Sequence, residues 1–62
     1  MSKTVGVIGL GDIGGRIASV LVEAYDVVVH DLDPDRVETL AEQGASVAES
    51  ARAVGERADV VI

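Results

Sequence analysis

The sequence predicts an α/β fold in which helices cover both faces of a parallel sheet. Short apolar runs rich in β-branched residues alternate along the chain with segments whose apolar residues recur at helical spacing. The runs contain no polar alternation, which is typical of parallel strands buried on both faces. The resulting order, β-α-β-α-β-(α)-β, implies strands joined by right-handed crossovers. We therefore expect a doubly wound sheet with strand order 3-2-1-4.

The first strand, the first helix and the second strand are expected in the N-terminal half of the chain. Residues 5–8 form an apolar run and predict the first strand. From Asp12 the period becomes helical, and the apolar stripe of an amphipathic helix consists of Ile13, Ile17, Val20, Leu21 and Ala24. Residues 27–31 predict a second buried strand, in which we interpret His30 as a core histidine rather than a catalytic one.

The second helix carries start and stop signals in the sequence. Asp33 is a suitable N-cap residue, and Pro34 is a suitable first helical residue. Gly44 provides the C-terminal stop. Between these signals, the expected buried stripe consists of Val37, Leu40 and Ala41.

The last elements of the chain are short. Residues 45–48 predict a third strand. Ser50 is a candidate cap for a weak helix that runs to about Arg57. Residues 59–62 begin a fourth apolar strand, and the chain stops within it. We therefore expect residues 1–62 to be the N-terminal portion of a truncated domain, with the catalytic and substrate-binding domain outside this chain.

The composition excludes several classes of function. The 62 residues suffice for one small domain, and its core must be aliphatic because Tyr25 is the single aromatic residue. With no cysteine and one histidine, disulfides, thiolate chemistry and a histidine metal cluster are not expected. No apolar stretch has the pattern of a signal peptide or the length of a membrane span. We therefore expect a cytoplasmic protein with no membrane partner.

The charge of the chain is strongly negative. Eleven acidic and five basic residues give a net charge of −6, and Lys3 is the single lysine. Such a charge argues against a nucleic-acid partner, because phosphate binding needs a basic surface. An acid-rich, lysine-poor surface suits a high-salt cytoplasm, where screening relieves self-repulsion. The alternative is an ordinary acidic domain.

A glycine-rich segment follows the first strand and opens the first helix. It fits the pattern GxGxxG and consists of Gly9, Leu10, Gly11, Asp12, Ile13 and Gly14. The first glycine permits a tight turn, the second lets a pyrophosphate approach the backbone, and the third lets the helix pack closely on the strand. Free N–H groups at the helix start then bind phosphate. The segment predicts a dinucleotide site; the alternative is a glycine turn that only packs helix on sheet.

The residues at the end of the second strand predict which dinucleotide binds. Asp31 follows the first glycine by about 20 residues, the position of a carboxylate that accepts hydrogen bonds from the adenosine ribose. Leu32 stands where an NADP site usually has a basic residue, so NAD is the expected cofactor and NADP the less favoured one. We interpret Arg36 as a solvated helix residue and Asp12 as an outward-facing residue that stabilises the helix dipole.

Three segments together resemble the NAD-binding domain of the β-hydroxyacid dehydrogenases, the family of 3-hydroxyisobutyrate dehydrogenase and 6-phosphogluconate dehydrogenase. They are VGVIGLGDIGGRIASVL, VVVHDLDPDRVETLAEQGA and ADVVI. The resemblance implies a partial Rossmann fold and a parent enzyme, expected to be a homo-oligomer, that transfers a hydride between NAD and a small 3-hydroxy acid. It also implies a catalytic serine loop and a catalytic lysine beyond Ile62, so we expect no catalytic residue in these 62.

The chain departs from this family pattern at two points. Ile13 stands where the family often has methionine, and residues 23–26 lack the glycine that usually ends the first helix. Two other enzyme families stay open as alternatives, the D-2-hydroxyacid dehydrogenases and the nucleotide-sugar dehydrogenases. A non-catalytic nucleotide-binding module and a minimal Rossmann fragment are further alternatives.

Overall fold

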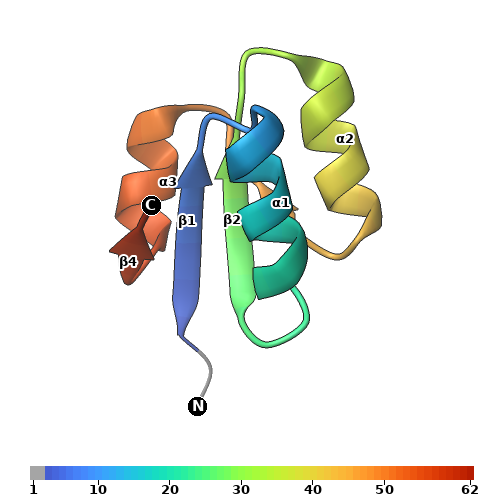
Figure 1. Ribbon diagram of the computed structural model, residues 1–62. Coiled ribbons are helices and arrows are strands. Elements are labelled where there is room, and N and C mark those ends of the chain that lie inside the picture. The colour runs from blue at the N-terminus through green and yellow to red at the C-terminus, as the bar shows by residue number, and fades with distance from the viewer. Residues whose placement is uncertain (1–2) are drawn as a thin grey trace.

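In the computed structural model, which describes residues 3–62, a parallel sheet runs between helices on both of its faces (Figure 1). The elements are β1 (Thr4–Ile8), α1 (Asp12–Leu21), β2 (Asp26–His30), α2 (Pro34–Glu42), β3 (Ser46–Val47), α3 (Ala51–Arg57) and β4 (Val60–Val61). The strands lie in the order β3-β2-β1-β4. The predicted α/β class and strand order 3-2-1-4 are confirmed.

The two central strands carry most of the pairing in the sheet. β1 and β2 pair in parallel over their full length, from Thr4 opposite Asp26 to Ile8 opposite His30. The edge strands β3 and β4 each pair through two residues. Because β1 and β2 end side by side, the loops that follow them meet at the same edge of the sheet.

The core consists of two apolar clusters, one on each face of the sheet. The larger cluster lies under α1 and α2 and consists of Val7, Leu10, Ala18, Val27, Val29, Leu40 and Ala45. The smaller cluster lies under α3 and consists of Val28, Ala48 and Val54. Alternate valines of β2 point into opposite clusters, which explains why this strand reads as a continuous apolar run.

The apolar stripe predicted for the first helix is partly wrong. Ile13 and Val20 are 76% and 69% exposed, and the helix ends at Leu21, before Ala24. Ala18 is the fully buried residue of α1 instead. The reason is close packing: α1 approaches the sheet through small residues such as Ala18, Leu21 packs on the core at the end of the helix, and Ile13 and Val20 lie on other faces.

The predicted caps and stops of the later elements are confirmed. Asp33 caps α2 by accepting a hydrogen bond from the Asp35 amide at 3.0 Å. Ser50 caps α3 in the same way, with the Ala53 amide at 3.0 Å. Gly44 follows α2 with a φ of +110°, the left-handed conformation that ends a helix.

Gly6 has a packing role that the sequence analysis did not assign. It is buried in the central strand β1, directly beneath α3. A Cβ atom at this position would stand 2.5 Å from Cγ1 of Val54 and 2.9 Å from Cβ of Ala58. The absence of a side chain at Gly6 therefore lets α3 lie close to the sheet.

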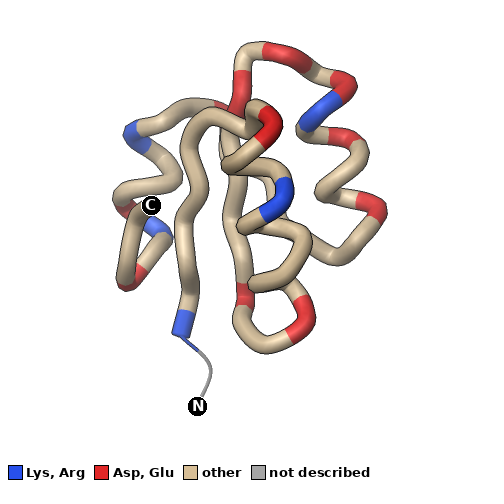
Figure 2. The backbone as a smooth tube through the Cα atoms, in the orientation of Figure 1, with Lys and Arg blue, Asp and Glu red and all other residues tan. Residues whose placement is uncertain are grey.

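The charged residues are distributed unevenly over the fold. Figure 2 shows acidic residues gathered along the segment that joins β2 to α2, where Asp31, Asp33 and Asp35 follow one another at alternate positions.

Within residues 3–62, the structure has no helix with the length and apolar character needed to cross a bilayer.

Candidate cofactor site

The turn after β1 requires glycine at its first position. Gly9 has a φ of +82°, a left-handed conformation that side chains rarely adopt. Its amide donates a 3.0 Å hydrogen bond to the carbonyl oxygen of His30, which extends the β1–β2 pairing by one step. The tight turn expected from the first glycine of the motif is therefore present.

The third glycine of the motif lies against the first. A Cβ atom on Gly14 would overlap the carbonyl oxygen of Gly9, and it would stand 3.9 Å from Cγ1 of Val7. The first turn of α1 is thus pressed directly onto the loop that leaves β1. This contact is the close packing of helix on strand that the motif predicts.

The second glycine of the motif is different, because the fold does not need a glycine there. Gly11 has an extended backbone with a φ of −63°. The nearest atom to a Cβ built on it is Nη1 of Arg36, at an ordinary contact distance of 3.7 Å. The one atom within 4 Å of such a Cβ therefore belongs to a guanidinium group, which binds phosphate well, and the residues present fit a pyrophosphate.

The N-terminus of α1 differs from the other two helix starts in residues 3–62. Side chains of Asp33 and Ser50 cap α2 and α3, but no side chain caps α1. The first hydrogen bond of the helix reaches from the Gly15 amide to the Gly11 carbonyl oxygen at 2.8 Å. The amides before Gly15 lack intrahelical acceptors, so they are available to an anion.

Asp31 joins the loop after β1 to the loop after β2. Its Oδ2 accepts a hydrogen bond from the buried Leu10 amide at 2.5 Å, and its Oδ1 accepts one from the Asp33 amide at 2.8 Å. The hydrogen bond from Asp33, then that from Leu10 and the positive charge of Arg36 lower the pKa of Asp31. The carboxylate is therefore ionised at neutral pH and held in a fixed orientation.

The two backbone bonds leave Asp31 able to bind a ligand. An ionised carboxylate offers about four acceptor positions on its two oxygens, and the backbone amides occupy two. The remaining positions are free for the hydroxyl groups of a ribose. The position of Asp31 in the sequence predicted the acceptor, but not the two amides that orient it.

A hollow of about 270 Å³ lies at the ends of β1 and β2. It is lined by Ile8, Gly9, His30, Asp31 and Leu32. Leu32 is 94% exposed, so its apolar side chain is available to a ligand. Sequence reasoning missed Ile8, although the parity of β1 could have placed it: Ile8 lies two residues from Gly6, on the α3 side of the sheet.

The interpretation of His30 as a core residue is wrong. The ring is half-buried and lies at the end of β2, in the wall of this hollow. Its Nδ1 is 3.2 Å from the carbonyl oxygen of Ala48, in the loop before α3. The ring lies at the rim because His30 is the last residue of β2.

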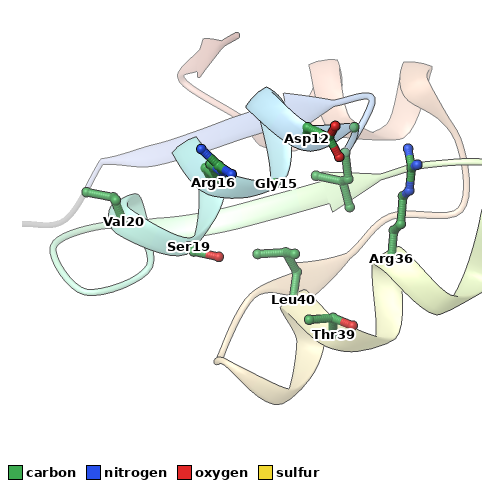
Figure 3. A pocket seen from close by; sticks show the side chains of 10 residues that line it. Asp12, Gly15, Arg16, Ser19, Val20, Arg36, Thr39 and Leu40 are labelled. Carbon is green, nitrogen blue, oxygen red and sulfur yellow. The ribbon is translucent and has the colours of Figure 1, made fainter.

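A larger groove of about 630 Å³ runs between α1 and α2 (Figure 3). It is lined by Leu10, Gly11, Asp12, Gly15, Arg16, Ser19, Val20, Arg36, Thr39 and Leu40. Arg36 lies at the end of the groove near Gly11 and pairs with Asp33 at 3.7 Å. Arg36 is thus half-exposed, as expected, but it faces the glycine loop. Ile13 lines neither this groove nor the hollow at the ends of β1 and β2.

A left-handed glycine turn, an uncapped helix start and an oriented carboxylate after the second strand define a nucleotide-binding α/β domain of the Rossmann class. Residues 4–62 match the family described as the NAD binding domain of 6-phosphogluconate dehydrogenase, and the chain belongs to this family. The predicted family and the expected NAD cofactor are confirmed.

Similar proteins agree with this assignment. The chain is 42% identical over 62 residues to a probable mitochondrial 3-hydroxyisobutyrate dehydrogenase from Dictyostelium discoideum, covering 98% of this chain and 19% of that protein. An imine reductase from Pseudomonas sp. superposes with a TM-score of 0.93 at 31% identity, over 98% of this chain and 22% of that one. An imine reductase variant from Myxococcus stipitatus in complex with NAD+ superposes with a TM-score of 0.84 at 34% identity, over 98% of this chain and 22% of that one. The chain thus spans about a fifth of its relatives' length.

Proposed function

We propose that the protein carrying this chain is an NAD-dependent dehydrogenase of 3-hydroxy acids, and that these 62 residues bind the ADP half of the cofactor. The observation that carries the proposal is the uncapped start of α1 beside Gly11, where the backbone leaves both room and hydrogen-bond donors for a pyrophosphate. The names of relatives such as 3-hydroxyisobutyrate dehydrogenase support the substrate class.

Each residue of the predicted site then has a defined role. The amides of Asp12, Ile13 and Gly14 donate to the pyrophosphate, helped by the positive end of the α1 dipole. Asp31 accepts from the ribose hydroxyls. Leu32 lies beside the adenosine and offers no charge to a 2′-phosphate. NAD, once bound, supplies a hydride acceptor, and the residues of this chain hold and orient it.

The preference for NAD over NADP is the part of the proposal most directly testable on these residues. The ionised Asp31 repels a 2′-phosphate, whereas Arg36 attracts one from the neighbouring helix. The carboxylate is held by hydrogen bonds from the Leu10 and Asp33 amides, whereas Arg36 is half-exposed and already pairs with Asp33. We therefore expect the native protein to bind NAD more tightly than NADP and Asp31→Ala to narrow the difference.

The experiment uses the native protein in its natural length. Titration with NAD and NADP measures the cofactor preference, and formation of NADH in the presence of 3-hydroxy acids measures the activity. Tighter binding of NADP would contradict the assigned role of Asp31. Cofactor binding with no turnover of any 3-hydroxy acid would favour the non-catalytic nucleotide-binding module.

A second candidate reaction is the reduction of imines. It is supported by the superposition on an imine reductase with a TM-score of 0.93. Both candidates use the same cofactor site, so the substrate distinguishes them. Consumption of a reduced nicotinamide cofactor with a cyclic imine, but not with a 3-oxo acid, would favour this second reaction.

The acidic surface supports a further part of the proposal, that the protein works in a high-salt cytoplasm. The net charge is −6, and three carboxylates stand at alternate positions between β2 and the first turn of α2. Repulsion among such charges weakens as salt screens it. A dependence of stability on salt concentration tests this part separately from the enzymatic function.

A further inference from the structure

The geometry of the cofactor site determines where the base of a bound nucleotide would lie. With the pyrophosphate at the start of α1 and the ribose at Asp31, the base leaves the ribose on the side away from the phosphates. The 270 Å³ hollow at the ends of β1 and β2 is lined by Asp31 and by its chain neighbours His30 and Leu32, so it adjoins the carboxylate that would bind the ribose. Its apolar walls, Ile8 and Leu32, are suited to the faces of a flat heteroaromatic ring.

His30 is a hydrogen-bonding side chain in this hollow whose ring is fixed. A carbonyl oxygen can only accept, so the 3.2 Å contact between Nδ1 and the Ala48 carbonyl requires the proton on Nδ1. In the neutral ring, Nε2 then carries a lone pair and accepts. Every buried side-chain nitrogen of residues 3–62 has a hydrogen-bond partner. Because the one hydrogen bond of the His30 ring is made by Nδ1, Nε2 is not buried and is accessible from the hollow or from solvent.

We propose that Nε2 of His30 accepts a hydrogen bond from the exocyclic amine of adenine, so that this residue selects the base of the dinucleotide. The proposal rests on the proposed role of this site in binding the ADP half of NAD. On ring carbon C6, adenine carries an amine, which donates, whereas hypoxanthine carries a carbonyl oxygen, which can only accept. Two acceptors then face each other, and the hydrogen bond is lost.

The selection distinguishes two dinucleotides that differ in this one group. The native protein should bind NAD about twofold to tenfold more tightly than nicotinamide hypoxanthine dinucleotide, the range that one neutral hydrogen bond supplies. His30→Phe keeps a flat aromatic ring but removes the acceptor. In this variant the ratio of the two affinities should fall to about one.

Isothermal titration of the native protein, His30→Phe and Leu32→Ala with both dinucleotides tests the proposal. Leu32 lines the same hollow without a polar atom, so Leu32→Ala should weaken both ligands by the same factor and preserve their ratio. As a second readout that needs no variant, the nitrogen-15 signal of Nε2 in the native protein should shift on addition of NAD and much less with the hypoxanthine analogue.

Two results would overturn the proposal. One is equal affinity of the native protein for both dinucleotides together with an unmoved Nε2 signal. The other is a His30→Phe variant that weakens both ligands equally, because that result assigns His30 a purely structural role. Tight NAD binding without base selection removes this inference alone, whereas a failure to bind NAD removes the proposed function as well.

Discussion

Alanine should lower the stability of the fold at Gly14, whereas at Gly11 it should weaken cofactor binding and leave the stability nearly unchanged. Alanine at Gly14 introduces a Cβ atom that overlaps the carbonyl oxygen of Gly9. That oxygen belongs to the backbone of a turn whose own φ is +82°, so it cannot rotate aside as a side chain would. The start of α1 must move away from β1 in this variant.

The cost of Gly14→Ala follows from two opposing effects. Overpacking of this kind destabilises by about 1–3 kcal/mol, and alanine is better than glycine inside a helix by about 0.5–1 kcal/mol. The free energy of unfolding should therefore fall by about 1–2 kcal/mol, which lowers the Tm of so small a domain by roughly 4–16 °C. Cofactor affinity should fall too, because the amides of α1 move with the helix.

Gly11→Ala is the matched control. The added Cβ meets its nearest neighbour, Nη1 of Arg36, at 3.7 Å, and the backbone at Gly11 is extended. The free energy of unfolding should change by less than about 1 kcal/mol, the usual cost of alanine at an N-cap. The methyl group occupies the space of the pyrophosphate, so NAD affinity should fall about tenfold or more.

Thermal melts and NAD titrations of the native protein and both variants provide the comparison. The expected pattern is a low Tm for Gly14→Ala and a near-native Tm with weak NAD binding for Gly11→Ala. Native NAD affinity in Gly11→Ala would refute the placement of the pyrophosphate. A native Tm in Gly14→Ala would refute the packing role of the third glycine.

Three other predictions concern stability. Gly6→Ala should lower the Tm, because the new Cβ meets Val54 at 2.5 Å; an unchanged thermal melt would contradict this. The stabilisation from Asp31, whose pKa is lowered, is present above its unfolded pKa of about 3.9 and is lost as pH falls through the folded pKa. Asp31→Asn should therefore flatten the acid limb of stability measured in urea. Raising KCl from about 0.1 to about 2 M should raise the Tm, and a flat or falling series would exclude the high-salt adaptation.

The sequence was sufficient to predict the order of elements and the topology of the sheet. Apolar runs of β-branched residues mark strands, and the rule of right-handed crossovers leaves few ways to arrange them. Local capping chemistry located the starts of α2 and α3, because Asp33 and Ser50 bond to amides within three residues of themselves. Signals of this kind are contained in short stretches of chain.

The face that α1 presents to the sheet could not be predicted from the same pattern. Apolar spacing shows that a helix has an apolar side, but close approach to a sheet favours small residues over large ones. Ala18 is buried while Ile13 is exposed, and the contact at Gly14 explains why. The clearest signal in the sequence was therefore the small residues, which a count of large apolar residues ignores.

The orientation of Asp31 depends on contacts that are distant in sequence. Spacing predicts a carboxylate at the end of the second strand, but the bond to Leu10 forms only when two loops meet at one edge of the sheet. His30 was misplaced for a similar reason. Its neighbours in sequence are buried valines, whereas its partner, Ala48, follows the next strand.

Differences among the three helix starts explain why we place the pyrophosphate at α1 and not at α2 or α3. In parallel α/β folds, every helix that follows a strand begins at the same edge of the sheet, so topology alone offers a positive dipole end at α1, α2 and α3. At α2 and α3 the oxygens of Asp33 and Ser50 already accept from the first-turn amides. Gly11 has no such oxygen, so α1 alone among the described helices keeps its donors for a ligand. The residue at the cap position thus determines which helix start is free to bind an anion.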